Sequence, residues 1–154
     1  MNFTSIDNFY TVYWLFGSMK DNVRIRKQKQ EILRTFRIVV AAVIVKEGSV
    51  LLLQRKDDEE VYPGLWELTG EKCEFNETSI KALVREVKEE TGLSIVVERP
   101  ISVFEYVVET LNEIRDTTQI NFLTRPTDLQ ETVQVNNKEY QAAHWFTKKE
   151  LFSL

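Results

Sequence analysis

The chain has 154 residues, of which 43% are apolar and 29% charged, and its net charge is −4. This composition is ordinary for one soluble globular domain and argues against a largely disordered chain. The acidic excess disfavours nucleic-acid binding over the whole surface, because neutralising phosphates needs an excess of Lys and Arg. The single cysteine, Cys73, excludes an internal disulfide and a cysteine-based zinc cage. No apolar run approaches the roughly 18 residues of a membrane span.

Residues 1–36 are predicted to be an N-terminal extension of a domain that covers residues 37–154. Residues 1–18 are rich in aromatics but lack a basic start, so we expect a cytoplasmic protein without a secretory signal. These aromatics predict packing or formation of a homodimer. Residues 20–37 carry seven basic and two acidic side chains. We favour a solvated helix that packs on the domain, with contact to nucleic acid or a membrane surface as the alternative.

The first elements of the domain are predicted to be strands. The apolar, β-branched run RIVVAAVIV predicts a buried strand, and the turn signal Glu47-Gly48 predicts a hairpin with the next strand. A polar loop then ends in Pro63-Gly64. In chain order the expected elements are strands at 37–45 and 49–55, a loop at 56–64, a strand at 65–68 and a loop at 71–77.

The clearest predicted element is a helix over residues 78–91. Its apolar stripe is Ile80, Leu83, Val84 and Val87, and Gly92 is suited to end it in a left-handed conformation. Strands outnumber helices and the strong helix lies within the strand series, which predicts an α+β class or a helix–sheet–helix sandwich. The later expected elements are strands at 94–98, 101–109, 117–124 and 141–146, and a short helix after a capping box at 147–150.

Three carboxylates cluster near the end of this helix. Glu86, Glu89 and Glu90 are spaced to share one face. Like charges at this spacing repel, and the negative end of the helix dipole disfavours them further. The cluster therefore indicates a bound cation, and oxygen ligands point to Mg²⁺ or Mn²⁺, which commonly bridge carboxylates and phosphates. A solvated Glu/Lys face is the alternative.

The stretch GEKCEFNETSIKALVREVKEETGL, residues 70–93, resembles the Nudix box. All but one of the signature's fixed positions match at the correct spacing: Glu77, Arg85, Glu86, Val87, Glu89, Glu90, Gly92 and Leu93. The exception is the first glycine of the box, which is Glu71 here. The resemblance covers about residues 37–151. It implies a Nudix-type α/β/α sandwich with a mixed β-sheet, in which the box forms a loop–helix–loop.

The resemblance also implies metal-dependent hydrolysis of a nucleoside diphosphate linked to another group. Glu86, Glu89 and Glu90 are the expected ligands of Mg²⁺ or Mn²⁺, and Glu86 or Glu89 the expected base. Arg85 is expected to pair with Glu89 or Glu77 and hold the carboxylates in place. The other implied roles are a metal-binding carbonyl for Gly70, loop ordering for Glu77, an additional carboxylate for Glu139, phosphate contact for Arg55, and base stacking for Trp66 or Tyr62.

Markers of several Nudix subfamilies are absent after and before the box. This leaves a (deoxy)nucleoside triphosphate pyrophosphohydrolase, releasing nucleoside monophosphate and pyrophosphate, as the expected activity. Two alternatives stay open. One is a non-catalytic nucleotide-binding or regulatory module, for which Glu71 is the sign of lost chemistry. The other is an enzyme resembling isopentenyl-diphosphate isomerase, indicated by the run Tyr-Pro-Gly-Leu-Trp at residues 62–66 and a nearby cysteine.

Overall fold

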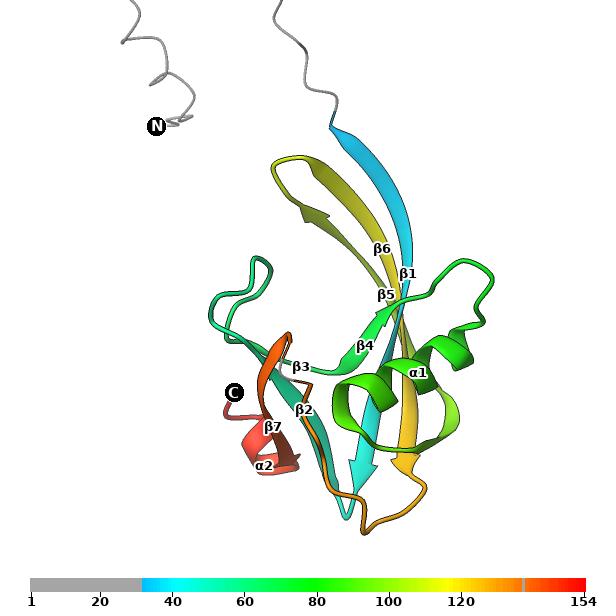
Figure 1. The fold of residues 1–154 in the computed structure, drawn as a ribbon, viewed down its shortest axis with the longest axis vertical. Coiled ribbons are helices and arrows are strands. Elements are labelled where there is room, and N and C mark those ends of the chain that lie inside the picture. Colours follow the sequence, from blue (N-terminus) through cyan, green and yellow to red (C-terminus); the bar gives the residue numbers. More distant parts are fainter. Residues whose placement is uncertain (1–31, 137) are drawn as a thin grey trace, which may run out of the picture. The chain divides into compact units, whose positions relative to one another are not determined.

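A mixed seven-stranded β-sheet forms the centre of the fold in the computed structural model, which describes residues 32–136 and 138–154 (Figure 1). The strand order is β3-β2-β1-β6-β5, with β4 paired to β1 and β7 paired to β2. The strands are β1 (Leu33–Lys46), β2 (Ser49–Arg55), β3 (Trp66–Glu67), β4 (Thr69–Lys72), β5 (Ile95–Glu109), β6 (Glu113–Pro126) and β7 (Tyr140–Thr147). The expected class, mixed sheet and helices are thereby confirmed.

Strand β1 is the central strand of the sheet because it pairs with three other strands, β6, β4 and β2, along its length. It runs parallel to β6 from Leu33 to Ile44, and antiparallel to β4 from Val39 to Ala42. Only its last two residues pair with β2, so the expected hairpin is short. Glu47 and Gly48 both have positive φ, as a type I′ hairpin turn requires.

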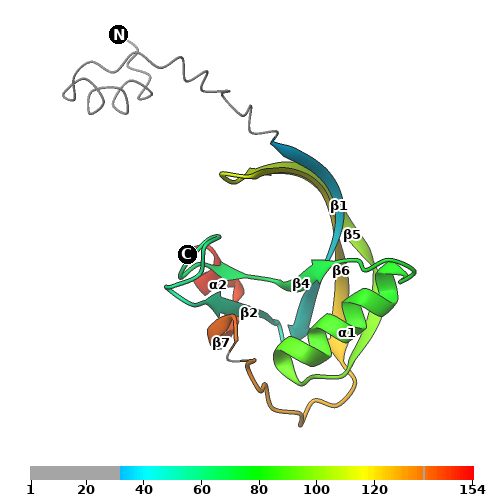
Figure 2. The same cartoon turned by 45° about the horizontal axis from the view of Figure 1, so that its top comes forward.

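The first half of β1, with β5 and β6, forms a curved ribbon that extends beyond α1 and β4 (Figures 1 and 2). We call this ribbon the arm; it comprises residues 33–39, 101–109 and 113–121. Since β1 begins at Leu33, residues 33–36 are strand, and the helix expected over residues 20–37 does not reach them. The remainder of the expected extension, residues 1–31, lies outside the described residues.

Two further strands differ from the expected ones. Strand β5 is continuous, where two strands with a break near Pro100 were expected. The ladder with β6 shifts register on both sides of Pro100, because proline has no N–H for the ladder and the chain bulges there. Strand β4 occupies the start of the expected loop at 71–77, so the box begins in a strand before its helix.

Helix α1 (Ser79–Thr91) has the expected ends. Its N-cap is Thr78, whose side chain accepts a hydrogen bond from the Lys81 N–H, and Gly92 ends it with φ 71°. Helix α2 (Lys148–Leu151) begins with the expected capping box between Thr147 and Glu150. In the part of the chain that the structure describes, neither helix has the length and apolarity to cross a membrane.

The hydrophobic core lies between α1 and the sheet. Its members with no exposed surface include Val40, Ala42 and Ile44 of β1, and Leu83 and Val87 of α1. Only half of the apolar stripe expected for α1 is buried, because Ile80 and Val84 are exposed (45% and 39%). The buried face is rotated so that it contains two acids, Glu86 and Glu90, each only 7% exposed. These two carboxylates therefore point into the protein.

Candidate functional site

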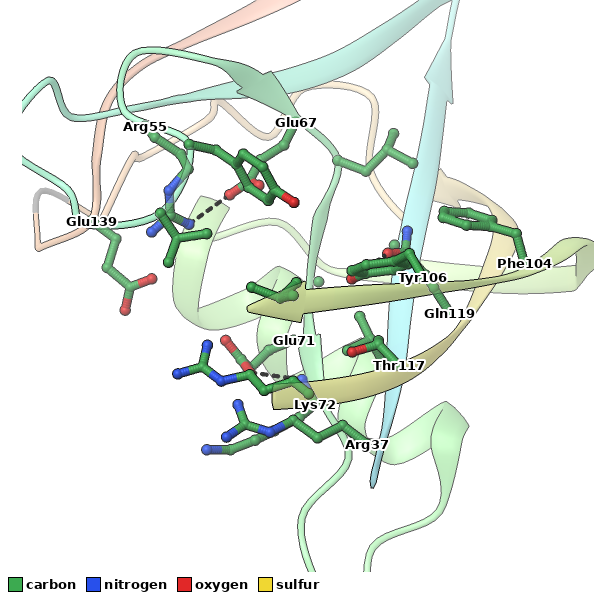
Figure 3. Close-up of a pocket in the computed structure, with 18 of the residues that line it drawn as sticks. Arg37, Arg55, Glu67, Glu71, Lys72, Phe104, Tyr106, Thr117, Gln119 and Glu139 are labelled. Carbon is green, nitrogen blue, oxygen red and sulfur yellow. Dashed lines mark hydrogen bonds and ion pairs between the residues drawn. The ribbon is translucent and has the colours of Figure 1, made fainter. Parts of the chain in front are cut away.

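A cavity of about 560 Å³ lies between the arm, strand β4 and the loop that follows β2. Figure 3 shows three groups of side chains around it. One group contains Arg55, Glu67 and Glu139; a second contains Arg37, Lys72 and Glu71; the third is a wall of Phe104, Tyr106 and Gln119 from the arm. The cavity thus combines two charged ends with one aromatic wall.

Arg85 connects the acidic residues of the box, as the sequence predicted. Its Nε and one terminal nitrogen bond both carboxylate oxygens of Glu77, at 3.0 and 2.8 Å. Its other terminal nitrogen contacts Glu86 closely and lies 3.6 Å from Glu89. The hydrogen bonds from Arg85 lower the pKa of Glu77. One guanidinium therefore ties the loop before α1 to two carboxylates of the helix.

Glu90 is the most deeply placed acid of the helix. Its Oε1 lies 3.0 Å from the hydroxyl of Tyr140, and the same hydroxyl lies 3.1 Å from Oε1 of Glu67. Burial raises the pKa of Glu90 to about 8, and the charges of Glu86, Glu67 and Glu139 add to this while Tyr140 opposes it. A phenol has one hydrogen to donate, so it can satisfy only one of the two carboxylates at a time.

The surroundings of Glu86 and Glu89 differ from those of Glu90. Burial raises the pKa of Glu86, with the hydrogen bond from Arg85 opposing this shift and the charges of Glu71 and Glu89 adding to it. The side chain of Glu89 is 57% exposed. The sequence predicted three carboxylates on one face of the helix, and the structure buries Glu86 and Glu90 while Glu89 is exposed. Their role as metal ligands stays a prediction.

The donor chemistry around Glu90 fits a divalent cation. The second carboxylate oxygen of Glu90, Oε2, is buried and has no hydrogen-bond partner. Such an orphaned oxygen is costly unless a cation or donor reaches it. Its neighbours are further carboxylates, the hard oxygen ligands that Mg²⁺ and Mn²⁺ prefer. Among residues 32–136 and 138–154, however, no three acidic, His or Cys side chains already converge as a preformed metal cluster.

Gly70 is required by packing. A Cβ at this position would lie 2.1 Å from the backbone oxygen of Val40 and 2.7 Å from Cα of Ala41. Both are atoms of the neighbouring strand β1, so only glycine allows β4 to pair there. The carbonyl role implied for Gly70 by the resemblance stays a prediction, and the glycine itself has a sufficient structural cause.

Glu71, the departure from the Nudix signature, occupies a regular strand position opposite Val40. The described non-glycine residues with positive φ are Glu47, Tyr62 and Asn76, so Glu71 carries no left-handed strain. Its carboxylate accepts a hydrogen bond of 2.8 Å from the N–H of Lys72. The backbone therefore gives no sign that this substitution has damaged the site.

The other predicted substrate-binding residues are placed unequally. Tyr62, Arg55 and Glu139 line the cavity. Arg55 is already paired with Glu67 at 2.9 Å and Glu59 at 3.0 Å, which engages it inside the protein. Trp66 is not among the lining residues; its ring packs edge-on against Phe146 at 4.9 Å. Trp66 thus packs within the fold, and its stacking on a base stays a prediction.

Several residues of the cavity were missed by sequence reasoning. Glu67 and Tyr140 lie outside the box and become neighbours of Glu90 only through the pairing of β2 with β3 and β7. No short-range pattern in the sequence predicts such a contact. The remaining missed residues are the cations and the wall contributed by the arm and β4: Arg37, Lys72, Arg115, Phe104, Tyr106 and Gln119.

Comparisons with known proteins agree with this geometry. The family description "NUDIX domain" matches residues 35–154. The chain is 35% identical over 112 residues to the CTP pyrophosphohydrolase of Escherichia coli K12, covering 73% of this chain and 76% of that protein. It is 32% identical over 122 residues to the nucleoside triphosphatase NudI of Enterobacter sp. strain 638, covering 77% and 86%. The crystal structure of a MutT protein from Methanosarcina mazei superposes with a TM-score of 0.67 at 25% identity, covering 80% and 86%.

Proposed function

The chain belongs to the Nudix hydrolase family, and we propose that it is a nucleoside triphosphate pyrophosphohydrolase of the MutT-like type. The observation that carries this proposal is the buried, unpartnered carboxylate oxygen of Glu90. The hydroxyl of Tyr140 contacts the other oxygen of this carboxylate, and Tyr140 lines a cavity large enough for a nucleotide. The names of the two relatives, a CTP pyrophosphohydrolase and a nucleoside triphosphatase, support a triphosphate substrate.

The acidic residues of α1 are proposed to hold the metal. Glu86 and Glu90, with Glu89 beside them, are the candidate ligands because two of these carboxylates are buried and one oxygen of Glu90, Oε2, has no hydrogen-bond partner. A bound Mg²⁺ or Mn²⁺ supplies positive charge that offsets the negative charge of the phosphate oxygens. Arg85 keeps the carboxylates of Glu86 and Glu89 in place from the side of the loop.

The proposed reaction is hydrolysis of a phosphoanhydride. The oxygen of a water molecule bonds to phosphorus, the bond from that phosphorus to the bridging oxygen breaks, and the products are nucleoside monophosphate and pyrophosphate. The water gives up a proton, for which Glu86 and Glu89 are the two candidate acceptors. Arg85 contacts both of them, so it orients the acceptor in either case.

The nucleobase is proposed to lie against the wall formed by the arm. The rings of Phe104 and Tyr106 are stacked with centroids 5.7 Å apart, which presents an extended apolar surface to the cavity. Gln119 lies beside them, with its Oε1 3.2 Å from the hydroxyl of Tyr106. Its amide is suited to hydrogen-bond a polar edge of the base.

A substrate screen tests the proposed function. The protein is incubated with Mg²⁺ or Mn²⁺ and a panel of ribo- and deoxynucleoside triphosphates, oxidised nucleotides and nucleotide sugars, and the products are separated by anion exchange. We expect monophosphate and pyrophosphate from at least one triphosphate. No turnover of any nucleotide would favour the non-catalytic module. Isomerisation of isopentenyl diphosphate, measured in parallel, would favour the second alternative.

A further inference from the structure

Two arginines of the arm share one glutamate on the cavity side of the sheet. A terminal nitrogen of Arg37 lies 3.0 Å from Oε1 of Glu113, and Nε of Arg115 lies 2.7 Å from Oε2. The hydroxyl of Thr35 donates to the same carboxylate at 2.7 Å. These contacts lower the pKa of Glu113 to about 2, with the hydrogen bonds from Thr35 and Arg115 as the first causes. Glu113 therefore holds both guanidiniums close together.

The guanidiniums have more hydrogen-bonding capacity than Glu113 uses. Each has five N–H donors in a planar fork, and Glu113 bonds one nitrogen of each. Both side chains are 29% exposed and line the cavity. Lys72 lines the same cavity and lies near Arg37 in Figure 3. This end of the cavity therefore presents fixed donors with a positive charge surplus, which is how proteins recognise phosphate.

The position of this cationic end relates it to the proposed metal site. Lys72 follows Glu71 on β4, and the charge of Glu71 contributes to the raised pKa of Glu86 on α1. Strand β4 packs against the box helix α1, and Arg37 lies beside Lys72 of β4, whereas Phe104, Tyr106 and Gln119 form a separate wall (Figure 3). A nucleotide whose base lies on that wall can direct its phosphate chain along the Glu71 and Lys72 side of the cavity towards the two arginines.

We propose that Arg37 and Arg115, held together by Glu113 and assisted by Lys72, bind the terminal phosphates of the substrate and select triphosphates over diphosphates. This inference rests on the proposed function, because it concerns the leaving pyrophosphate of the same reaction. The selection follows from chain length. A diphosphate placed with its scissile bond at the metal site has one phosphate fewer to offer to the guanidinium pair, so it loses charge-assisted hydrogen bonds that the triphosphate makes.

The first test compares the triphosphate and the diphosphate of the same nucleoside. In Arg37→Gln and Arg115→Gln we expect the ratio of kcat/KM for triphosphate over diphosphate to fall roughly 10- to 100-fold, the loss of a charge-assisted hydrogen bond. Arg34→Gln is the matched control. Arg34 lies on the same strand but on the opposite face, where it pairs with Asp116 at 2.6 Å. In Arg34→Gln the ratio of kcat/KM for triphosphate over diphosphate should equal that of the unmutated protein.

The second test separates this inference from the proposed function. Calorimetric titration with inorganic pyrophosphate in the presence of Mg²⁺ should show binding that weakens roughly tenfold or more in both arginine variants but not in Arg34→Gln. An unchanged pyrophosphate affinity, or an unchanged triphosphate-to-diphosphate ratio, would overturn the role of the arginine pair while leaving hydrolysis intact. Absence of turnover with retained, arginine-dependent pyrophosphate binding would instead overturn the proposed function alone.

Discussion

Replacing Glu90 by glutamine removes an ionisable carboxyl from the buried face of α1 while keeping the size of the side chain. In the metal-free protein this change should cost little. Burial raises the pKa of Glu90 to about 8, so its carboxyl is mostly neutral at pH 7, as an amide is. The amide oxygen can keep the 3.0 Å contact with Tyr140. We expect the free energy of unfolding to change by no more than about 1 kcal/mol, the size of one hydrogen bond.

The effect on catalysis should be much larger. Loss of a preorganised charge that stabilises the transition state costs on the order of 3–4 kcal/mol, or roughly 10²- to 10³-fold in kcat/KM. The assay is steady-state release of pyrophosphate from the best triphosphate of the screen. Glu98→Gln, at a half-exposed residue of β5 paired with Arg125, is the control and should keep its activity.

Thermal unfolding of the same variants with and without Mg²⁺ isolates the metal site. A ligand that binds only the folded state stabilises it by about 2.7 kcal/mol at a concentration one hundred times its Kd. The unmutated protein and Glu98→Gln should gain stability with millimolar metal, and Glu90→Gln should gain markedly less. If Glu90→Gln kept full turnover and the full metal-dependent shift, the assignment of α1 as the metal site would be refuted.

Three further changes test other parts of the structure. Gly70→Ala forces a Cβ against the Val40 carbonyl and should destabilise the fold by about 3 kcal/mol or more in urea denaturation. Glu71→Gly should leave turnover unchanged or raise it, at a stability cost of about 0.5–1 kcal/mol for glycine in a strand; abolished turnover in a folded variant would make Glu71 a working residue. The contacts of Glu113 lower its pKa to about 2 in the folded protein, whereas a Glu in the unfolded chain has a pKa of about 4.3. These contacts therefore stabilise the protein fully above pH 4.3, and their contribution is lost as the pH falls towards 2. The melting temperature of Glu113→Gln should therefore lie below that of the unmutated protein by the largest amount above pH 5, and this difference should decrease as the pH is lowered.

The local parts of the fold were predictable because short-range patterns determine them. The cap of α1 by Thr78, its end at Gly92 and the capping box before α2 each depend on residues within one turn of the helix. The pairing of Arg85 with Glu77 was predictable for the same reason, since both belong to the box. These features needed no knowledge of which strands are neighbours.

The arm and its charges could not be predicted from spacing alone. Arg37 and Glu113 are separated by 76 positions and meet only because β1 runs parallel to β6. The basic residues before position 37 indicated a surface helix, but Arg34 and Arg37 lie on opposite faces of one strand. Non-local pairing of this kind is set by the whole sheet, so it leaves no signal within a window of ten residues.

The rotation of α1 has a different physical cause. A purely apolar packing would bury Ile80 and Val84, but the structure exposes them and buries Glu86 and Glu90. Burying two carboxylates on one face is unfavourable by itself, as the raised pKa of each residue indicates. On the arm, the guanidiniums of Arg37 and Arg115 line the cavity and share the single carboxylate of Glu113. A ligand that brings a cation to the carboxylates of α1 and phosphates to the guanidiniums of the arm offsets the negative charge of the first and the positive charge of the second. A metal-bound nucleoside triphosphate has that distribution of charge.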